Sequence, residues 1–595
     1  MTHPIVSPVS THNPGLPLRI GTFDSLVDGL DYAARGETGL TFFSGRGEAQ
    51  DRLTYRDLQA EARELAARLV GAGLERGSRF ALIAETSPAF MLWFFACQYA
   101  GLLPVPLPLS VNLGSHDAYV RRLRGMLNSA GPVAAMAPAD LLPVLREAAI
   151  GTEVTHLGTA EDFRGLPIAG GAPRPFGADD PSYIQYSSGS TTEPRGVLIT
   201  QRAITANARA IARDGLKVRA GDRAASWLPL YHDMGLVGFC ITPMLAQVSV
   251  DYLATATFAV RPRTWLKVIS EQGGTVSYSP TFGYELCVRR AGRDGGGGFR
   301  LQQWRVAGIG GEMVRPNVLT DFARMFAASG FDERAFVPSY GLAEATLAVS
   351  FAPLETGARV DTIDREQYER FNRASVSAEV EAQEGHRARS FVACGEPLPG
   401  YSIEIRDDED HPVPERSIGR VFVNGPSLMT GYYGRPDMTR RVLGDDGWLD
   451  TGDMGYRVDD SLVITGRRKD LIICNGRNIW PQDLEWALEQ VDGVKTGSVA
   501  AFSISEDDAE RVVLVVECYA NDLAPRQALV HDLTAIIQRT AGVHCEVTLV
   551  SPRTLPYTSS GKLSRAAAKQ QYLSGALTPL PTVRGEAVAD ALTGG

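Results

Sequence analysis

The stretch YIQYSSGSTTEPRG, residues 183–196, gives the clearest local indication of how this chain folds. It begins with the strand-like residues Tyr183, Ile184 and Gln185 and passes at once into a turn made of serine, threonine and glycine. Small residues let backbone N–H groups approach phosphate oxygens closely, and hydroxyls and a guanidinium add further donors. Those side-chain donors are Ser187, Ser188, Ser190, Thr191 and Arg195. The pattern predicts a phosphate-binding turn; it is not a Walker A loop, and a plain turn is the alternative.

Segments with helical periodicity alternate with short apolar runs over most of the chain. An amphipathic helix is predicted to begin near Thr54, with an apolar stripe at Leu58, Ala62, Leu65 and Leu69. Apolar runs at residues 79–84, 275–278 and 305–309 are typical of buried strands. This alternation predicts an α/β protein with mainly parallel sheets covered by helices.

Composition excludes several classes of protein. The 595 residues are 44% hydrophobic and 22% charged, as in an ordinary globular protein. The 59 Lys and Arg against 69 Asp and Glu leave a net charge of −10, which argues against a nucleic-acid partner. The seven cysteines include no C-x-x-C pair, and residues 1–15 have no basic and apolar signal segment. We therefore expect a cytoplasmic protein with reduced cysteines.

One uncharged stretch, residues 86–116, raises the question of a membrane span. Its apolar part is interrupted by Pro104, Pro106 and Pro108, which end any helix before it reaches the roughly 20 residues that a span requires. We expect a buried helix over residues 89–100 followed by an extended proline-containing segment, and no membrane span.

The pattern restarts after Gly466. A helix is predicted from Pro481, with Leu484, Ala487, Leu488 and Val491 on one face, followed by a strand at 511–519, a helix at 527–540 and a strand at 546–549. This predicts an N-terminal domain over residues 1–466, a boundary at 467–469, a compact C-terminal domain over 470–580 and a flexible tail over 581–595. Residues 352–393 are charged and poor in aliphatic side chains, and we expect an irregular insertion with one short helix at 364–372.

Five further segments carry polar side chains suited to a nucleotide. Gly310-Gly311-Glu312 follows a strand, SYGLAE at 339–344 offers an aromatic face and a carboxylate, and LDTGD at 449–453 ends in an acid. A nucleotide requires a stacking surface, an acid for the ribose hydroxyls and an acid for Mg²⁺, which Tyr340, Asp453 and Glu344 could supply. GRRKD at 466–470 and TSSGK at 558–562 add cations. Each segment alone is equally compatible with solvated loop residues.

Taken together and in this order, these segments resemble the adenylate-forming superfamily of acyl-CoA synthetases, peptide-synthetase adenylation domains and luciferases. The resemblance spans residues 183–562. It implies a large N-terminal domain with two α/β subdomains and a β-barrel-like one, and a small mobile C-terminal α+β domain. It also implies a two-step reaction, in which a carboxylate and ATP give acyl-AMP and pyrophosphate and a second nucleophile then takes the acyl group.

The resemblance assigns roles to individual residues. Glu344 would bind Mg²⁺, Lys469 would lie at the hinge, and Lys562 would bridge the carboxylate and the α-phosphate as a mobile positive charge. The residues expected to bind ATP or AMP are Ser187, Ser188, Gly189, Ser190, Thr191, Thr192, Arg195, Gly311, Glu312, Ser339, Tyr340, Gly341, Asp453 and Arg467. Thr192 and Arg195 depart from the usual glycine and lysine of the phosphate loop.

Within the superfamily the chain is more similar to the fatty acyl-AMP ligases, which transfer the acyl group to an acyl carrier protein. The segments that carry this likeness are 227–236, 261–266, 284–289, 340–346 and 476–483. The likeness implies that His232 lies near the reacting carboxylate, and that the insertion at 352–393 restrains the C-terminal domain and disfavours coenzyme A. Residues 563–595 are too few for a carrier domain, so the expected acceptor is a separate protein.

Alternatives stay open at this point. An acyl-CoA synthetase would share the first step, and a catalytically weakened binding or regulatory protein would fit the departures at Thr192 and Arg195. The expected substrate is a medium- or long-chain fatty acid. Candidate residues for its acyl tunnel are Phe239, Phe282, Ile309 and Met313, and each is equally compatible with ordinary core packing.

Overall fold

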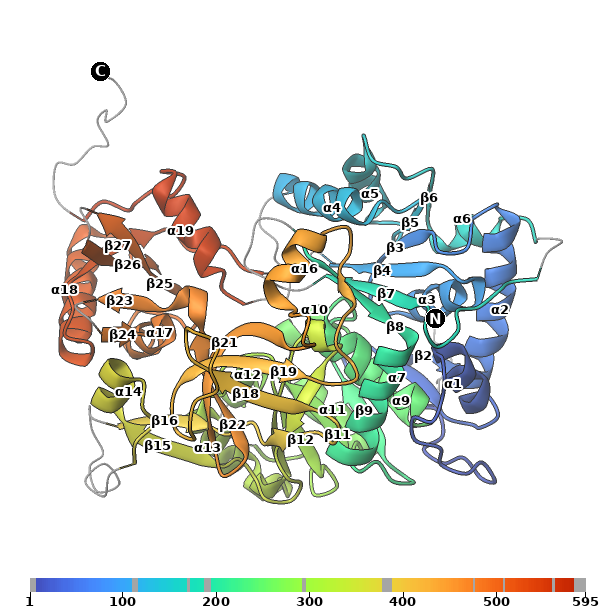
Figure 1. The fold of residues 1–595 in the computed structure, drawn as a ribbon, viewed down its shortest axis with the longest axis horizontal. Coiled ribbons are helices and arrows are strands. Elements are labelled where there is room, and N and C mark those ends of the chain that lie inside the picture. The colour runs from blue at the N-terminus through green and yellow to red at the C-terminus, as the bar shows by residue number, and fades with distance from the viewer. Residues whose placement is uncertain are drawn as a thin grey trace.

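The computed structural model describes residues 7–109, 116–168, 172–186, 194–291, 296–376, 388–474, 477–506, 509–558 and 562–582. Its largest layer is a nine-stranded sheet in the order β17-β14-β13-β12-β11-β9-β10-β1-β2 (Figure 1). The strands from β1 to β13 in this order are parallel, and β2, β14 and β17 are antiparallel additions at the edges. Their bounds are β1 (Gly39–Phe43), β2 (Ala49–Thr54), β9 (Arg223–Ser226), β10 (Ser249–Leu253), β11 (Val276–Ser279), β12 (Val306–Ile309), β13 (Phe336–Gly341), β14 (Ala348–Phe351) and β17 (Glu396–Pro397).

Helices between these strands cover the sheet. They are α1 (Leu26–Ala33), α7 (Gln201–Arg209), the π-helices η1 (Ala210–Gly215) and η2 (Leu236–Ile241), α8 (Asp233–Gly235), α9 (Thr242–Leu245), α10 (Thr255–Val260), α11 (Arg263–Gln272), α12 (Thr281–Arg289) and α13 (Pro316–Phe326). The parallel α/β arrangement predicted from the alternating pattern is therefore confirmed.

A second parallel sheet has the order β4-β3-β5-β6. Its strands are β3 (Arg79–Ile83), β4 (Leu103–Leu107), β5 (Ala134–Met136) and β6 (His156–Gly158), and its helices are α2 (Tyr55–Gly71), α3 (Pro88–Ala100), α4 (His116–Ala130), α5 (Leu142–Ala149) and α6 (Ala160–Arg164). α2 begins after Thr54, whose side chain accepts from the Asp57 amide, so the predicted helix start is confirmed.

The uncharged stretch is core, as expected. Every residue of α3 from Phe90 to Ala100 is buried. Pro104 and Pro106 lie in β4, an edge strand that tolerates missing amide donors, and Pro108 follows its end. No helix among the described residues is long and apolar enough to cross a membrane.

Two further sheets are antiparallel. One contains β18 (Ser402–Arg406), β19 (Gly419–Asn424), β21 (Leu449–Val458) and β22 (Ser461–Arg467), and another contains β7 (Pro181–Tyr186), β8 (Gly196–Thr200) and β20 (Gly431–Tyr432), followed by α16 (Pro436–Val442). The quoted turn at 187–193 lies between β7 and β8 but outside the described residues, so the sequence-based assignments there stay predictions.

The segment at 352–393 is more regular than predicted. The expected short helix is confirmed as α14 (Arg365–Phe371), but it is flanked by β15 (Val360–Asp364) and β16 (Ala388–Val392), which pair antiparallel. The apolar side chains Ile363, Tyr368 and Phe391 of this hairpin and helix pack with Tyr456 and Trp480. The description of the segment as irregular was wrong because this pairing joins residues nearly 30 positions apart, beyond the reach of local periodicity.

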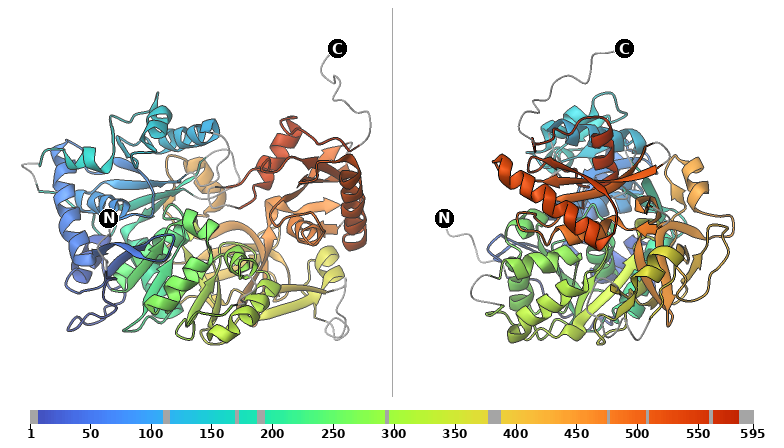
Figure 2. Two further views of the ribbon diagram at one scale, coloured as in Figure 1. Left: turned by 180° about the vertical axis from the view of Figure 1, so that it is seen from behind. Right: turned by 90° about the vertical axis from the view of Figure 1, so that its left-hand side faces the viewer.

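The C-terminal elements form a separate layer at one end of the molecule (Figures 1 and 2). They are β23 (Ile472–Cys474), β24 (Arg477–Ile479), α17 (Pro481–Leu488), β25 (Val499–Glu506), β26 (Ala509–Glu517), α18 (Leu523–Thr540), β27 (Cys545–Val550) and α19 (Arg565–Leu573). Both predicted strands and both predicted helices are present. β23, β24, β25 and α19 were not predicted, and Val491 lies beyond the end of α17.

Candidate functional site

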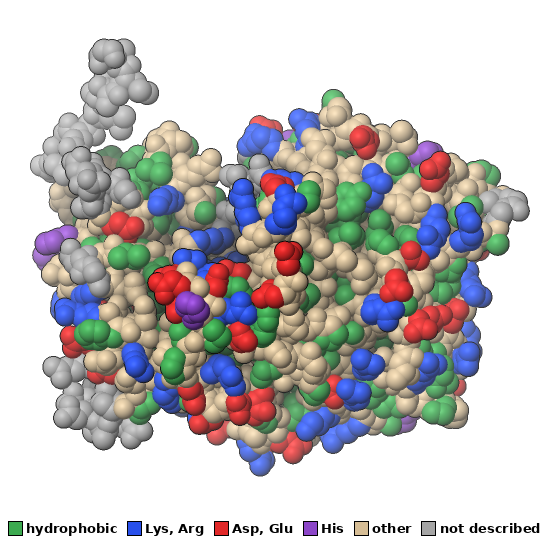
Figure 3. All heavy atoms as spheres, viewed as in Figure 1, with side chains coloured by type: hydrophobic (Ala, Val, Ile, Leu, Met, Phe, Trp, Pro, Cys, Tyr) green, Lys and Arg blue, Asp and Glu red, His purple; other side chains and the backbone are tan. Residues whose placement is uncertain are grey.

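A cavity of about 660 Å³ opens where the carboxyl ends of the parallel strands meet the antiparallel sheets and the C-terminal elements. In the space-filling view, Lys and Arg side chains gather around the hollow between the C-terminal elements and α16 (Figure 3). The cations that line the cavity are Arg195, Arg467, Arg468, Lys469 and Lys562. This charge suits an anionic ligand such as a polyphosphate.

Tyr340, Asp453 and Arg467 form one connected group at the polar end. The Tyr340 hydroxyl donates to Asp453 Oδ2 at 2.7 Å, and Arg467 Nε donates to the other carboxylate oxygen at 3.0 Å. Asp453 and Arg467 face each other because they are register partners on β21 and β22. Burial, and then the Asp453 charge, raise the pKa of Tyr340, so its hydroxyl stays protonated and continues to donate. Tyr340 and Arg467 line the cavity, and Asp453 lies directly behind them.

Tyr432, a residue that the sequence analysis missed, contacts both Glu344 and Arg195. The Tyr432 hydroxyl donates to Glu344 Oε1 at 2.8 Å, and the Arg195 guanidinium lies 5.7 Å from the centre of the Tyr432 ring. All three line the cavity. Arg195 Nε is buried and has no hydrogen-bond partner among the described residues. The positive charge of Arg195 suits an anionic ligand at this end of the cavity.

Lys562 reaches the cavity from the C-terminal elements and donates a hydrogen bond to the Gly311 carbonyl. Its loop is held by Arg565, which binds both carboxylate oxygens of Glu485 at 2.7 and 2.6 Å and also contacts Asp470. Burial lowers the pKa of Lys562, and the Glu312 carboxylate opposes this shift. For Glu312, burial instead raises the pKa of the carboxyl group. Glu312 does not line the cavity, and its carboxylate accepts a hydrogen bond from the Phe282 amide at 2.9 Å.

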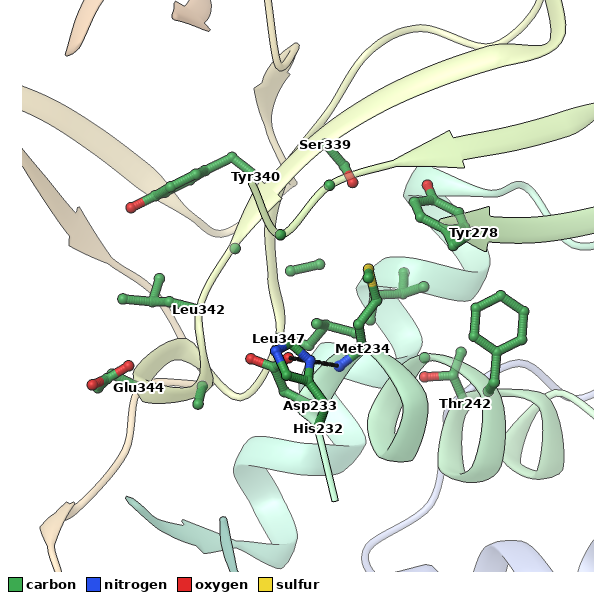
Figure 4. Close-up of a pocket in the computed structure, with 18 of the residues that line it drawn as sticks. His232, Asp233, Met234, Thr242, Tyr278, Ser339, Tyr340, Leu342, Glu344 and Leu347 are labelled. Carbon is green, nitrogen blue, oxygen red and sulfur yellow. Dashed lines mark hydrogen bonds and ion pairs between the residues drawn. The ribbon is translucent and has the colours of Figure 1, made fainter. Parts of the chain in front are cut away.

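His232 lines the cavity beside Asp233, a residue that the sequence analysis did not predict. Its Nδ1 is 2.6 Å from Asp233 Oδ1, and the Met234 amide donates to the same carboxylate oxygen at 2.6 Å (Figure 4). Burial would raise the pKa of Asp233, but its contacts with His232 and Met234 hold that pKa below its ordinary value. The turn is tight because a Cβ on Gly235 would lie 2.1 Å from the Pro229 carbonyl oxygen. The signal in the sequence is the HDMG string, in which only the histidine was singled out.

The remaining predicted residues of the polar end also line the cavity: Gly311, Ser339, Gly341 and Lys469. Gly341 is required there, since a Cβ would lie 1.8 Å from the Leu347 carbonyl oxygen. Burial, followed by the charge of Arg467, lowers the pKa of Lys469. The hinge role of Lys469 stays a prediction.

The other end of the cavity is an apolar tunnel, and the sequence-based expectation for it was mostly wrong. Phe239 lines the tunnel, but Phe282, Ile309 and Met313 are not among its described lining residues. Phe282 packs on Trp227 at 5.7 Å, and Met313 packs against the cluster that contains Trp480. The apolar lining residues instead include Ile211, Leu216, Val218, Pro243, Ala246, Val248, Val276, Leu347 and Phe351.

Known proteins of one family are similar to this chain. The family model for AMP-binding enzymes matches residues 30–433. A Caulobacter vibrioides protein named as an acyl-CoA synthetase is 47% identical over 561 residues, covering 94% of this chain and 97% of the relative. The medium-chain-fatty-acid–[acyl-carrier-protein] ligase JamA of Moorena producens is 30% identical over 576 residues, covering 93% and 96%.

A solved structure from work on fatty acyl-adenylate ligases of E. coli and L. pneumophila superposes with a TM-score of 0.90 at 45% identity, covering 94% of this chain and all of that chain. The family model spans well over half of the residues, and the two relatives match nearly end to end. The chain therefore belongs to the family of AMP-binding enzymes and has the adenylate-forming fold with a large N-terminal and a small C-terminal domain.

Proposed function

We propose that the protein activates a medium- or long-chain fatty acid as acyl-AMP and then transfers the acyl group to the phosphopantetheine thiol of a separate acyl carrier protein. The observation that carries the proposal is the continuity of one cavity from a cationic end, with Lys562 and Arg195, to an apolar tunnel. The name of the Moorena relative supports a carrier protein as the acceptor.

In the first step, a carboxylate oxygen of the fatty acid attacks the α-phosphorus of ATP. The bond from that phosphorus to the bridging oxygen breaks, and pyrophosphate leaves with the electron pair. The Lys562 ammonium, held at the Gly311 carbonyl, is placed to stabilise the negative charge that develops on the α-phosphate oxygens. Tyr340 offers its ring to the base, and Arg195 offers its positive charge to the phosphates.

The residues present also fit Mg²⁺. Glu344 lines the cavity close to Arg195, and carboxylate oxygens are the ligands that Mg²⁺ prefers. When bound, Mg²⁺ would neutralise phosphate charge in this part of the cavity. Tyr432 orients the Glu344 carboxylate for this role through its hydrogen bond.

In the second step, the thiol sulfur attacks the acyl carbon, the thiol proton is lost and AMP leaves. The choice of acceptor is proposed to depend on the contacts between the insertion and the C-terminal elements. Arg477 Nε donates to Glu369 Oε2 at 3.1 Å, Asn478 Nδ2 donates to Asn372 Oδ1 at 2.8 Å, and the Tyr368 ring stacks with Trp480 at 6.4 Å. We propose that these contacts limit the domain rotation that coenzyme A would need.

The name of the Caulobacter relative supports a second candidate, an acyl-CoA synthetase. Mass spectrometry of the products formed from ATP, Mg²⁺, mixed fatty acids and excess coenzyme A distinguishes the two. Acyl-AMP that accumulates without acyl-CoA supports the carrier-loading ligase and reveals the chain length. Abundant acyl-CoA establishes the synthetase, and the absence of both products, together with no pyrophosphate release, contradicts both.

Loosening the insertion is expected to increase acyl-CoA formation. The double variant Arg477→Ala, Asn478→Ala removes two contacts to the insertion and leaves Glu369 paired with Arg365 at 2.7 Å. Loss of a charge-assisted hydrogen bond favours release of the C-terminal elements from the insertion by roughly tenfold. Acyl-CoA production should rise by about that factor. The matched control is Arg370→Ala. Arg370 forms an exposed ion pair with Glu366 within α14, so its loss removes no contact between the insertion and the C-terminal elements. An unchanged acyl-CoA yield from a folded double variant would show that these contacts do not exclude coenzyme A.

The pH dependence of the first step should reflect Lys562. Because burial lowers its pKa, this ammonium loses its charge at a lower pH than an ordinary lysine. Acyl-AMP formation should therefore fall as the pH rises toward this depressed pKa. In Lys562→Arg the guanidinium stays protonated, so the alkaline decline should disappear even if the maximal rate is lower. The same decline in both proteins would assign it to another group.

A further inference from the structure

Two hydroxyl groups in the apolar tunnel are buried and have no hydrogen-bond partner in the part of the chain that the structure describes. Thr242 is 2% exposed and Tyr278 is 7% exposed, and both line the cavity. Neither Thr242 Oγ1 nor the Tyr278 hydroxyl has a hydrogen-bond partner among the described residues. Buried polar groups in folded proteins are nearly always hydrogen-bonded, since an unmade bond costs the full desolvation of the group. Each hydroxyl is therefore expected to find its partner in whatever occupies the tunnel.

The Tyr278 ring is fixed in place by its neighbours. Tyr278 and Val276 alternate with Ser277 on β11, so these two side chains face the tunnel, while Ser277 donates to the Ala225 carbonyl at 2.5 Å on the other face. The ring lies against Gly308, where a Cβ would come within 2.1 Å of it, and it contacts Phe239 edge-on at 6.3 Å. This packing leaves the hydroxyl little freedom to search for another partner within the protein.

Thr242 presents its hydroxyl from the helical wall. It is the first residue of α9, directly after the π-helix η2 and before Pro243. A helical threonine often bonds back to a carbonyl in the preceding turn, but Thr242 Oγ1 makes no such bond. In the close-up, Thr242 and Tyr278 come from the helix and the strand on two sides of the tunnel, away from Glu344 and Tyr340 (Figure 4).

Two other polar side chains, Ser339 and Asp222, also line the cavity. Burial raises the pKa of Tyr278, and the nearby Ser339 hydroxyl opposes this rise without completing a hydrogen bond among the described residues. At the far end, the Asp222 carboxylate is bound by Arg305 and Thr275 at 2.5 to 2.9 Å. The Asp222 carboxylate is therefore already satisfied, whereas Thr242 Oγ1 and the Tyr278 hydroxyl have no partner in the described part of the chain. β11, along which the tunnel runs, has four residues and spans roughly 13 Å.

We propose that the tunnel selects a fatty acid that carries a hydroxyl group within its chain, recognised by Thr242 and Tyr278. A hydroxyl on the chain can donate to, or accept from, either of these side chains. This inference rests on the proposed activation of fatty acids. It adds the substrate class: a chain-hydroxylated acid is preferred over the unsubstituted acid of equal length. A site built to bond a hydroxyl discriminates against the analogue without one, because its own polar groups are then left unpaired.

The test compares one saturated acid with its isomers hydroxylated next to the carboxylate, in the middle of the chain and at the terminal carbon. Binding is measured by calorimetry, and activation by pyrophosphate release. The mid-chain isomer is expected to bind and react about tenfold better than the unsubstituted acid. In Thr242→Val and Tyr278→Phe, which keep the side-chain shape, this ratio should fall toward one, and Thr242→Ser should restore it in part.

A matched control is Tyr252→Phe, a buried tyrosine whose hydroxyl is already bonded to the Phe239 carbonyl at 2.7 Å. It should leave the ratio as it is in the wild type. The proposal is overturned if no hydroxylated isomer exceeds the unsubstituted acid in binding, or if the ratio survives both substitutions. If the acids bind with the expected preference and no pyrophosphate is released, the proposed function fails while the tunnel assignment stands.

Discussion

Acyl-AMP formation by the Lys562→Ala variant is expected to be slower than that of the wild type by about 10²–10³-fold, the usual effect of removing one preorganised donor to a developing charge. Lys562 contacts the Gly311 carbonyl from a loop that Arg565 anchors to Glu485 and Asp470. The ammonium is therefore placed before the reaction begins, and alanine leaves nothing to replace it. ATP affinity should change little, because Arg195, Tyr340 and Asp453 remain.

The loss is measured as pyrophosphate release at saturating ATP and fatty acid, with ATP binding followed separately by calorimetry. Lys569→Ala is the matched control, since Lys569 lies on α19 in the same domain and outside the lining of the cavity. Wild-type rates in the Lys562→Ala variant would remove Lys562 from the proposed mechanism. Equal loss in both variants would indicate damage to the C-terminal domain instead.

Replacing Arg223 by methionine is expected to lower the free energy of unfolding by about 3–5 kcal/mol. Arg223 and Asp251 form a bidentate pair in the core of the main sheet, with side chains 3% and 0% exposed and Nε to Oδ2 at 2.6 Å. Arg223 also donates to the Val9 carbonyl at 2.9 Å and so holds the N-terminal segment. Without its partner, Asp251 is left as a buried charge that nothing compensates.

Urea denaturation at neutral pH measures this loss. Burial already raises the pKa of Asp251, and Arg223 opposes that shift. Removing the arginine raises this pKa further, so the destabilisation should shrink as the pH falls and the carboxyl becomes protonated. The double variant Arg223→Met, Asp251→Leu should recover most of the stability, because no buried charge remains. A change below about 1 kcal/mol in the single variant, as in exposed pairs, would contradict this account.

Much of the fold could be predicted because it depends on local patterns. The apolar run at α3 and the prolines of β4 predicted a buried helix followed by an extended segment, and both are present. The strands β15 and β16 were not predicted because they are short and partly exposed, and they become regular only when they pair across a long connection. Ile309 is apolar and therefore a reasonable tunnel candidate by residue type, but it lies in the core. Its neighbour on β12, Gly308, is the residue that lies against the Tyr278 ring.

The sequence by itself determined the family, the α/β architecture and the types of side chain at the polar end, because ordered motifs and periodicity are properties of neighbouring residues. Only the tertiary structure decided which of these residues meet. It paired Tyr340 with Asp453 across 113 positions and placed Tyr432 in contact with both Glu344 and Arg195. It also left the hydroxyls of Thr242 and Tyr278 in the tunnel without a hydrogen-bond partner among the residues described. Such contacts depend on strand register and on how helices pack against sheets, and residues distant in the chain carry no local signal of them.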